Sequence, residues 1–193
     1  MEYIHSISTE ELNQLPRVLY EGEVQVISSI EAVEEVVAVL KKSPVLGFDT
    51  ETKPSFHKGK SNRNPVALLQ LSTESKVYLF RINKMGLPQS IVDILADPAI
   101  IKVGAAVRED IRILQKITPF KAENFIELQD MVKKFDIENF SLKKLAAIIL
   151  NIRISKSQRL SDWEADELSD GQVRYAATDA WVCHEIYNRL MKD

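Results

Sequence analysis

Cysteine is almost missing from this chain of 193 residues, because Cys183 is the only one. A single thiol excludes an internal disulfide and any metal cluster built from cysteine ligands. Long apolar runs are missing as well, so nothing offers a membrane span, and the opening MEYIHSISTEELNQLP lacks the basic and apolar regions of a secretory signal. We therefore expect a soluble protein of a reducing, cytoplasmic compartment.

A strong charge of either sign is also missing. The formal net charge is −3, with 27% charged and 45% hydrophobic residues, which is ordinary for a globular protein. Broad electrostatic attraction to nucleic acid or to a membrane is not indicated, so any nucleic-acid binding has to come from a local basic groove. The histidines His5, His57 and His184 are not spaced as metal ligands, and we assign none of them to chemistry.

Linkers are missing too, since no Gly/Ser-rich or low-complexity run divides the chain, and one core is expected. Residues 1 to 23 show little periodicity and are punctuated by Pro16 and Gly22, which predicts an N-terminal extension. The domain proper is predicted to cover residues 24 to 193.

The first half of this domain predicts a strand, a helix and a hairpin. A short strand at residues 24 to 27 precedes Ser28 and Glu31, whose capping-box spacing starts a helix of about three turns. Further strands are predicted at residues 45 to 51, 66 to 72 and 76 to 82. The last two are separated by only three residues, TES, and should form a hairpin.

The second half alternates between helices and strands. The segments PQSIVDILAD and REDIRILQKI read as helices, and AIIKVGAA and NFIEL read as strands. Ser141 is predicted to cap a helix with one apolar stripe, and Ser169 with Gln172 to form a capping box for a long last helix over residues 170 to 191. The expected fold class is α/β, with a mixed sheet of five to six strands flanked by helices.

Two carboxylates close an apolar strand in the segment VLGFDTETKP. Asp49 and Glu51 are one alternation apart, so both leave the strand on the same face. Paired acids at a strand end are often simply solvated. The end of a strand in an α/β fold is, however, the usual ligand site, and Mg²⁺ or Mn²⁺ would remove the repulsion between the two acids.

Further acids follow in separate segments. Asp110 stands near the start of a helix in VGAAVREDIRIL, and Asp179 stands four residues after Tyr175, on one helical face of VRYAATDAW. A bland interpretation exists for each of them, because Asp110 would also suit a helix dipole and Tyr175 would also suit a core. The tryptophans Trp163 and Trp181 are expected to pack rather than to stack on bases.

The order Asp-x-Glu, distant Asp and Tyr-x-x-x-Asp resembles the DEDDy group of 3′-5′ exonucleases, which have the ribonuclease-H-like fold. The segments PVALLQLST, YLF, SLKKLA and SDWEADELSDGQVRYAATDA resemble the branch of ribonuclease D and the exonuclease domain of the Werner-syndrome helicase, over residues 24 to 191. The resemblance implies removal of nucleotides from the free 3′ end of a nucleic acid, releasing nucleoside 5′-monophosphates.

The resemblance also implies roles for the matching residues. Asp49, Glu51 and Asp179 would hold the ion on the side of the nucleophile, Asp49 would be shared with a second ion, and Asp110 would act through the outer shell. Two such ions can stabilise the attacking and leaving oxygens at phosphorus. Tyr175 would orient or deprotonate the attacking water.

Basic residues in the loop after the acid strand are candidates for substrate binding. Lys58, Lys60 and Arg63 would by default be solvated, but their loop begins at the metal strand, and we expect them to contact phosphate. The sequence does not decide between DNA and RNA.

Two other functional classes compete with this interpretation. A phosphatase with an aspartyl nucleophile needs an aspartate and a small hydroxyl residue where this chain has Glu51 and Lys53, so that interpretation fails at two positions. A noncatalytic nucleic-acid-binding or scaffold domain would ordinarily have lost one of the acids or the tyrosine, and this chain retains all of them.

Overall fold

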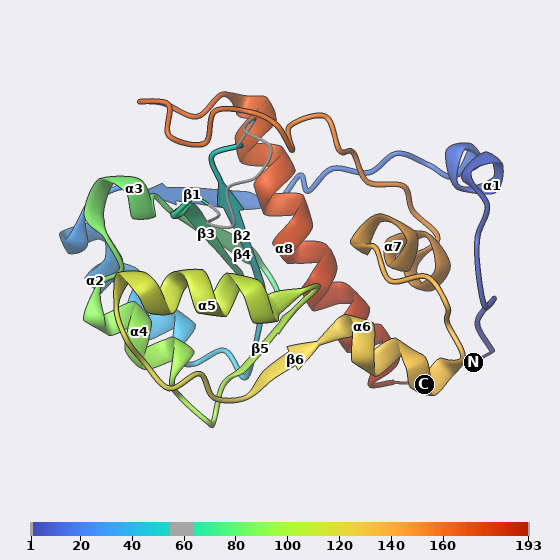
Figure 1. Ribbon diagram of the computed structural model, residues 1–193, viewed down its shortest axis with the longest axis horizontal. Coiled ribbons are helices and arrows are strands. Elements are labelled where there is room, and N and C mark those ends of the chain that lie inside the picture. The colour runs from blue at the N-terminus through green and yellow to red at the C-terminus, as the bar shows by residue number, and fades with distance from the viewer. Residues whose placement is uncertain (1, 55–63, 193) are drawn as a thin grey trace.

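The computed structural model describes residues 2–54 and 64–192. A six-stranded sheet in the order β1-β4-β3-β2-β5-β6 forms its centre (Figure 1). The strands are β1 (Glu23–Ile27), β2 (Val45–Thr52), β3 (Val66–Ser72), β4 (Lys76–Phe80), β5 (Ile101–Gly104) and β6 (Phe125–Glu127). The pairs β2·β3 and β3·β4 are antiparallel, and the pairs β1·β4, β2·β5 and β5·β6 are parallel. The predicted mixed sheet and its hairpin are therefore confirmed.

Helices cover both faces of this sheet (Figure 1). They are α1 (Thr9–Gln14), α2 (Ile30–Leu40), α3 (Ile82–Met85), α4 (Gln89–Leu95), α5 (Val107–Ile117), α6 (Leu128–Met131), α7 (Leu142–Leu150) and α8 (Asp170–Leu190), with a 3-10 turn at Val132–Phe135. None of the helices in the described part of the chain is long and apolar enough to cross a membrane.

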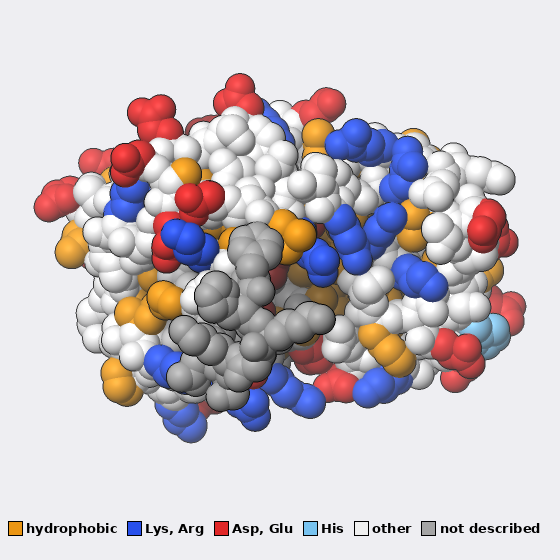
Figure 2. All heavy atoms as spheres, turned by 45° about the horizontal axis from the view of Figure 1, so that its top comes forward, with side chains coloured by type: hydrophobic (Ala, Val, Ile, Leu, Met, Phe, Trp, Pro, Cys, Tyr) orange, Lys and Arg blue, Asp and Glu red, His pale blue; other side chains and the backbone are white. Residues whose placement is uncertain are grey.

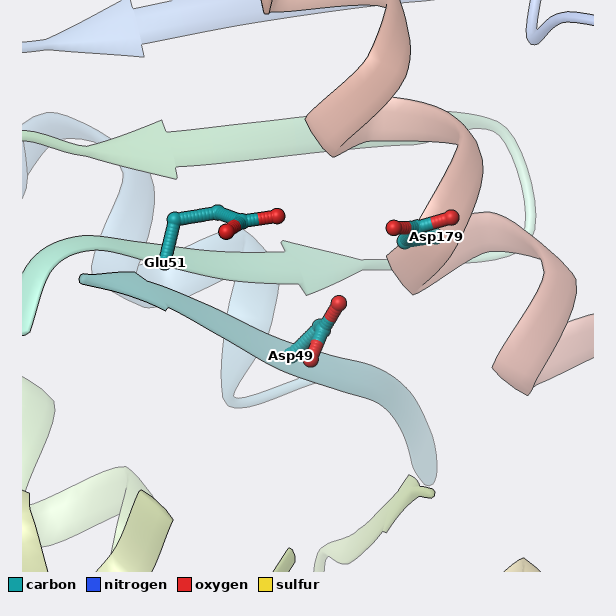
Figure 3. Close-up of side chains that lie close together, drawn as sticks. All are labelled: Asp49, Glu51 and Asp179. Carbon is teal, nitrogen blue, oxygen red and sulfur yellow. The ribbon is translucent and has the colours of Figure 1, made fainter. Parts of the chain in front are cut away.

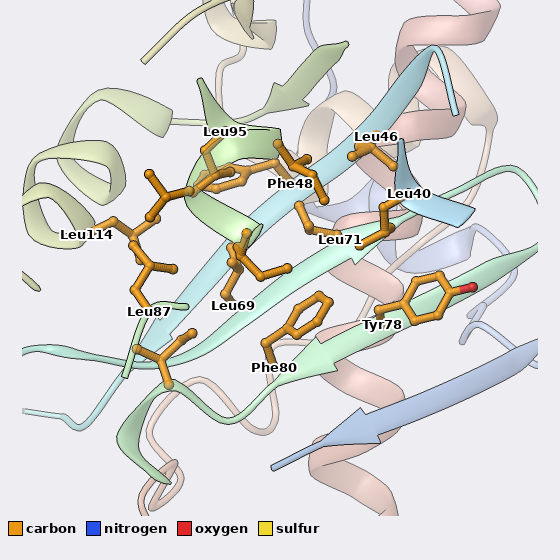
Figure 4. Close-up of a cluster of buried hydrophobic side chains, with 14 of the residues drawn as sticks. Leu40, Leu46, Phe48, Leu69, Leu71, Tyr78, Phe80, Leu87, Leu95 and Leu114 are labelled. Atoms are coloured by element: carbon orange, nitrogen blue, oxygen red, sulfur yellow. The ribbon is translucent and has the colours of Figure 1, made fainter. Parts of the chain in front are cut away.

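One face of the sheet packs against α2, α4 and α5 in a cluster of mostly apolar side chains (Figure 4). Leu46 and Phe48 of β2, Leu69 and Leu71 of β3 and Phe80 of β4 point into it, and all five are 0% exposed. Alternation along β2 therefore sends its apolar residues to this face. The residues between them are left for the other face.

The opposite face packs against α8, which crosses β1 to β5. Ala176, Ala177 and Ala180 contact the sheet with small side chains, so the helix lies close to the strands. Gly47 shows how close: a Cβ there would stand 2.0 Å from the backbone oxygen of Ala180. Only glycine fits at this position, which brings the last helix directly onto the strand that carries the acids.

The N-terminal segment contains a helix that its weak periodicity does not predict, because residues 9 to 14 form α1 with a capping box between Ser8 and Glu11. Its buried Leu12, together with Tyr3 and Ile7, packs against α7 and α8. Short helices of this kind depend on packing more than on periodicity, which a six-residue stretch hardly displays.

Helix starts differ from prediction at two other places. α2 is capped by Ser29, whose hydroxyl accepts from Ala32 N at 3.3 Å, so the box predicted from Ser28 and Glu31 does not form. Ser141 precedes α7 without a capping hydrogen bond from its side chain. The box of Ser169 and Gln172 at the start of α8 is confirmed.

Candidate active site

The acid strand β2 delivers two carboxylates to the α8 face. Asp49 and Glu51 alternate with Phe48 and Thr50, and both lie on the side of the sheet where α8 passes (Figure 3). Because Gly47 lets α8 approach, Asp179 on the helix reaches the same place. One carboxylate oxygen from each of the three acids lies within 4.8 Å of the other two. Acids from two distant segments thus converge, as the sequence pattern predicts.

The fourth acid, Asp110, stands beside this group of three rather than within it. It occupies the first turn of α5, where the Glu127 carboxylate accepts hydrogen bonds from the backbone N–H groups of Ala106 and Val107 at 2.8 and 2.9 Å. Asp110 Oδ1 accepts a 2.8 Å hydrogen bond from Thr50 Oγ1, between the two acids of β2. Asp110 therefore lies close enough for its charge to raise the pKa of Asp49 and of Glu51.

Tyr175 is buried and still faces the acids. Its side chain is 6% exposed, and its ring lies 6.0 Å from that of Trp163, centroid to centroid. The hydroxyl is hydrogen-bonded to the Asp179 carboxylate one turn further along α8. The sequence presents a core role and a site role for Tyr175 as alternatives. In the structure the ring packs in the core while the hydroxyl binds an acid of the site.

Burial raises the pKa of all three carboxyl groups, and repulsion by neighbouring carboxylates adds to this for Asp49 and Glu51. The pKa of Asp49 is raised well above its usual value, first by burial and then by the charges of Asp179, Glu51 and Asp110. Burial, followed by the charges of Asp179 and Asp110, raises the pKa of Glu51 to about 9. Burial raises the pKa of Asp179 to about 7, against the lowering effect of the hydrogen bond from Tyr175. The three groups cannot all be ionised at neutral pH without a compensating cation.

The donor set fits a hard divalent cation. It consists of carboxylate oxygens, which Mg²⁺ and Mn²⁺ prefer, and no cysteine or histidine belongs to it. Octahedral Mg²⁺ with ligands at about 2.1 Å spans roughly 4.2 Å between opposite oxygens, close to the observed spread. Because the pKa values of these carboxyl groups are raised, they hold protons in the absence of metal, and a bound cation would displace those protons.

Tyr175 is a hydrogen-bonding group in this setting. Burial, followed by the charges of Asp179, Glu51 and Asp49, raises the pKa of its phenol above the ordinary value. A phenol with a raised pKa stays neutral and orients its partners. In the cation-free protein this favours the orienting role over the deprotonating one.

The segment before α8 closes one side of the site. Trp163 of this segment is fully buried, Lys53 Nζ binds Glu164 Oε2 at 2.9 Å, and Gln172 Nε2 donates to the Asp162 carbonyl at 3.0 Å. Arg81, 2% exposed, donates to the carbonyl of Ala165. These contacts fix the segment against the end of β2 and the start of α8. The segment therefore holds Trp163 in the core and also borders the acid group.

Two cations of this segment, Lys156 and Arg159, were not predicted from the sequence as site residues. The charge of Arg159 lowers the pKa of Glu51, and the charge of Lys156 lowers that of Asp179, so both lie near the acids. The available signal is a basic pair three residues apart, directly before LSDWEAD. Gln70 is a second omission: it pairs with Asp49 across β2 and β3, is 0% exposed, and neither amide atom has a partner among the residues described.

The other predicted candidates lie elsewhere. Lys58, Lys60 and Arg63 fall outside the described residues, as does His57. His5 contacts the Asp136 carbonyl, and His184 lies 3.2 Å from the Asn188 amide. Neither described histidine belongs to the acid group.

Comparison with known proteins agrees with this arrangement. A family model described as 3′-5′ exonuclease matches residues 24–193. The chain is 36% identical over 163 residues to the bifunctional 3′-5′ exonuclease/ATP-dependent helicase WRN of Mus musculus, covering 81% of this chain and 12% of that protein. Ribonuclease D of Gluconacetobacter diazotrophicus is 27% identical over 169 residues, covering 86% of this chain and 42% of that protein.

The fold is shared with solved nuclease domains. The crystal structure of the Aedes aegypti Nibbler EXO domain superimposes with a TM-score of 0.78 at 25% identity, covering 98% of this chain and 92% of that one. The resemblance to the branch of ribonuclease D and the Werner-syndrome exonuclease domain, and the ribonuclease-H-like fold that it implies, are thus confirmed. The protein belongs to the 3′-5′ exonuclease family.

Proposed function

We propose that this protein is a metal-dependent 3′-5′ exonuclease that hydrolyses phosphodiester bonds of a nucleic acid from its free 3′ end. The observation that carries the proposal is the meeting of Asp49, Glu51 and Asp179 within 4.8 Å, in a chain of the exonuclease family. Because the chain spans only part of its curated relatives, their whole activities and substrates are not carried over.

Asp49, Glu51 and Asp179 would hold Mg²⁺ or Mn²⁺, with Asp49 shared between two ions and Asp110 acting from the outer shell through Thr50. When bound, the two ions supply positive charge that acidifies the attacking water and stabilises the leaving oxygen. The protein's own contribution is to hold the carboxylates in position. Gly47 and the alanines of α8 do this by keeping helix and strand together.

Tyr175 would orient or deprotonate the attacking water through its hydroxyl. Its hydroxyl is fixed at Asp179 by a hydrogen bond and by the packing of its ring on Trp163. The water gives up a proton as its oxygen forms a bond to phosphorus, the bond from phosphorus to the 3′ oxygen of the preceding nucleotide breaks, and that oxygen takes up a proton, so one water is consumed for each bond cleaved. A nucleoside 5′-monophosphate leaves, and the shortened strand ends in a new 3′ hydroxyl.

The basic residues Lys58, Lys60 and Arg63 are proposed to hold substrate phosphates. Replacing all three with alanine should raise KM and flatten the salt dependence, while kcat at saturation changes little. An unchanged KM and salt slope would return them to the solvated surface.

A digestion assay tests the proposal. Single-stranded DNA, duplex DNA with a recessed 3′ end, and RNA, each labelled at the 5′ end, are incubated with Mg²⁺, with Mn²⁺ or with excess chelator. A ladder that shortens from the 3′ end only with metal is expected, and the three substrates report the preference for DNA or RNA. A ladder in chelator would contradict the proposal. Binding without turnover on every substrate would favour the noncatalytic alternative.

A further inference from the structure

Two exposed cations stand on one turn at the edge of the acid group. Lys156 and Arg159 are joined by a backbone hydrogen bond from Arg159 N to the Lys156 carbonyl at 3.3 Å. Neither side chain has a hydrogen bond or an ion pair in the part of the chain that the structure describes. Exposed cations without a hydrogen bond or ion pair, held on a fixed turn, are suited to binding anionic groups.

This turn lies over the start of α8. A Cβ on Gly171 would come within 3.2 Å of Gln158 Nε2, in the middle of the turn, and Ser161 Oγ ties the turn together through the Gln158 carbonyl at 2.6 Å. Tyr175 and Asp179 follow one and two turns further along the same helix. The turn that carries the cations is thus packed on the same helix that carries Tyr175 and Asp179.

The N-terminal segment adds a third cation beside this turn. Arg17 forms a β-bridge with Arg153, supported by hydrogen bonds from Arg153 N to the Pro16 carbonyl at 2.9 Å and from Val18 N to the Arg153 carbonyl at 3.0 Å. Its guanidinium donates to Ser155 Oγ at 3.3 Å, next to Lys156 in the chain. Arg17 has no acidic partner among the described residues.

The segment that carries Arg17 is anchored to the domain. Tyr20 N donates to Thr178 Oγ1 at 2.9 Å, and Arg174 donates to the carbonyls of Tyr20 and Gly22 at 3.1 and 2.8 Å. Figure 2 shows Lys and Arg side chains gathered on this face of the molecule, beside the hollow. A basic surface is therefore built jointly by the turn and by a segment that the family match, which begins at residue 24, leaves out.

We propose that Arg17, Lys156 and Arg159 form a phosphate-binding strip, which holds the backbone of the nucleic-acid strand whose 3′ end enters the acid group. The strip rests on the proposed function, because it assigns that function a path for its substrate. Through Arg17, the N-terminal segment would also take part in substrate binding. The net charge of −3 explains why such a strip matters: attraction of the strand has to be local.

Binding measurements test the strip separately from catalysis. The Asp49→Asn protein prevents turnover, and its affinity for a fluorescent single-stranded 12-mer of DNA or RNA is followed by anisotropy over a range of salt. Adding Arg17→Ala, Lys156→Ala and Arg159→Ala together should weaken binding at least about tenfold. Each lost phosphate contact lowers the slope of log Kd against log salt by about 0.7, so a decrease of about 2 is expected.

A matched control removes the same charge elsewhere. Lys41, Lys42 and Lys116 are exposed and lie before the start of β2 and at the end of α5, away from the acid end of the sheet. Their triple alanine variant should retain affinity and salt slope. Arg17→Lys should restore most of the affinity lost in Arg17→Ala, because a cation remains.

The outcomes separate the two proposals. Equal affinities and slopes for the strip variant and the control variant, or no binding of either strand, would overturn the strip. Hydrolysis by the wild-type protein with such equal affinities would overturn the strip alone. Strip-dependent binding by a protein that hydrolyses none of the three substrates would instead contradict the proposed nuclease function. In the active protein the strip variant should lose kcat/KM through a raised KM.

Discussion

The two faces of the sheet both bury charge, in opposite ways. On the face of α2, α4 and α5, Lys102 is 0% exposed, and its ammonium donates to the carbonyls of Asp97 and Ile100 at 2.8 Å each. It also stands 5.3 Å from the centroid of the Phe125 ring. A buried charge with this many partners is tolerated as part of the structure.

On the α8 face the buried charges repel one another. Burial raises the pKa of Asp49, Glu51 and Asp179, and the charge of Asp179 raises the pKa of Asp49 and Glu51 further. The described cations near these acids, Lys156 and Arg159, are exposed. Such a group destabilises the fold when it is ionised, and persists where a ligand compensates it. The two faces therefore differ in what their charges indicate. A buried charge with hydrogen-bond partners, such as Lys102, is part of the structure, whereas carboxylates held close together indicate a ligand site.

The largest expected effect follows from removing one acid of the group. Asp49→Asn should lower exonuclease turnover at least about 10³-fold, which corresponds to about 4 kcal/mol of barrier. Without metal it should melt no lower than the wild-type protein, because a neutral amide replaces a carboxyl group whose ionisation is opposed by burial and by its neighbours. Asp136→Asn is the control, since Asp136 is exposed with φ 56°, which asparagine tolerates. Wild-type turnover in Asp49→Asn would remove it from the site, and Asp179→Asn is tested in the same way.

The next effect concerns a hydroxyl on the α8 face. Tyr175→Phe retains the ring on Trp163 and deletes only the group that binds Asp179, so kcat should fall about 10²- to 10⁴-fold while the melting temperature stays the same. Tyr187→Phe is a matched control, because Tyr187 is also buried on α8 and its hydroxyl has no hydrogen bond among the described residues. Normal turnover with a melting temperature several degrees lower would make Tyr175 a core residue only.

The apolar face should respond in the opposite manner. Leu40→Ala removes a 0% exposed side chain of α2 and should lower the free energy of unfolding by about 2–5 kcal/mol, while each folded molecule retains its activity. Val39→Ala, at a 47% exposed position one residue earlier, should change it by less than about 0.5 kcal/mol. Urea unfolding measures both variants. A loss of activity in folded Leu40→Ala would mean that the two faces are not independent.

Much of this division could be read from the sequence. Period-two alternation in VLGFDTE separates the two faces of β2, and the spacing of Tyr175 and Asp179 places both on one side of α8. The convergence of distant acids followed from the resemblance of the whole ordered set of motifs. These signals are local or linear, and they were sufficient for the sheet and the group of three acids.

Other features depend on contacts between distant segments. α1 is too short to show periodicity, and the cap of α2 shifted by one residue to Ser29. The bond from Thr50 to Asp110 spans 60 residues, and the bridge from Arg17 to Arg153 spans still more of the chain. No pattern in the sequence predicts such pairs, because they are set by tertiary packing. The same holds for Lys156 and Arg159, whose charges matter only through their distance from the acids.

A smaller effect is expected in how the free energy of unfolding depends on pH for the acids of the α8 face. Folding raises the pKa of Glu51 from 4.5 to about 9 and that of Asp179 from 3.8 to about 7, so the folded state binds more protons than the unfolded state between these values. Stability from these groups is complete at low pH and is lost as pH rises toward 9. In chelator, Glu51→Gln should therefore gain stability over wild type between pH 5.5 and 8.5. Urea unfolding at several pH values measures this difference, and a difference independent of pH would contradict it.

The smallest effect has the opposite sign and tests the paired charge. Burial lowers the pKa of Lys102 from 10.5 to about 8 in the folded state. Below pH 8 both states are protonated and the unfavourable burial of the charge is complete. Between pH 8 and 10.5 the folded state releases its proton first, so stability from this residue rises with pH.

Lys102→Met removes this titration and leaves the carbonyls of Asp97 and Ile100 without the ammonium donor at every pH. That loss is independent of pH, so only the change with pH reports the charge. The unfolding free energy of wild type minus that of Lys102→Met should rise between pH 8 and 10, while the corresponding difference for Glu51→Gln in chelator falls between pH 5.5 and 8.5. A flat difference for Lys102 would mean that the two carbonyls and Phe125 compensate the ammonium fully, and the paired charge would then be as stable in the fold as in water.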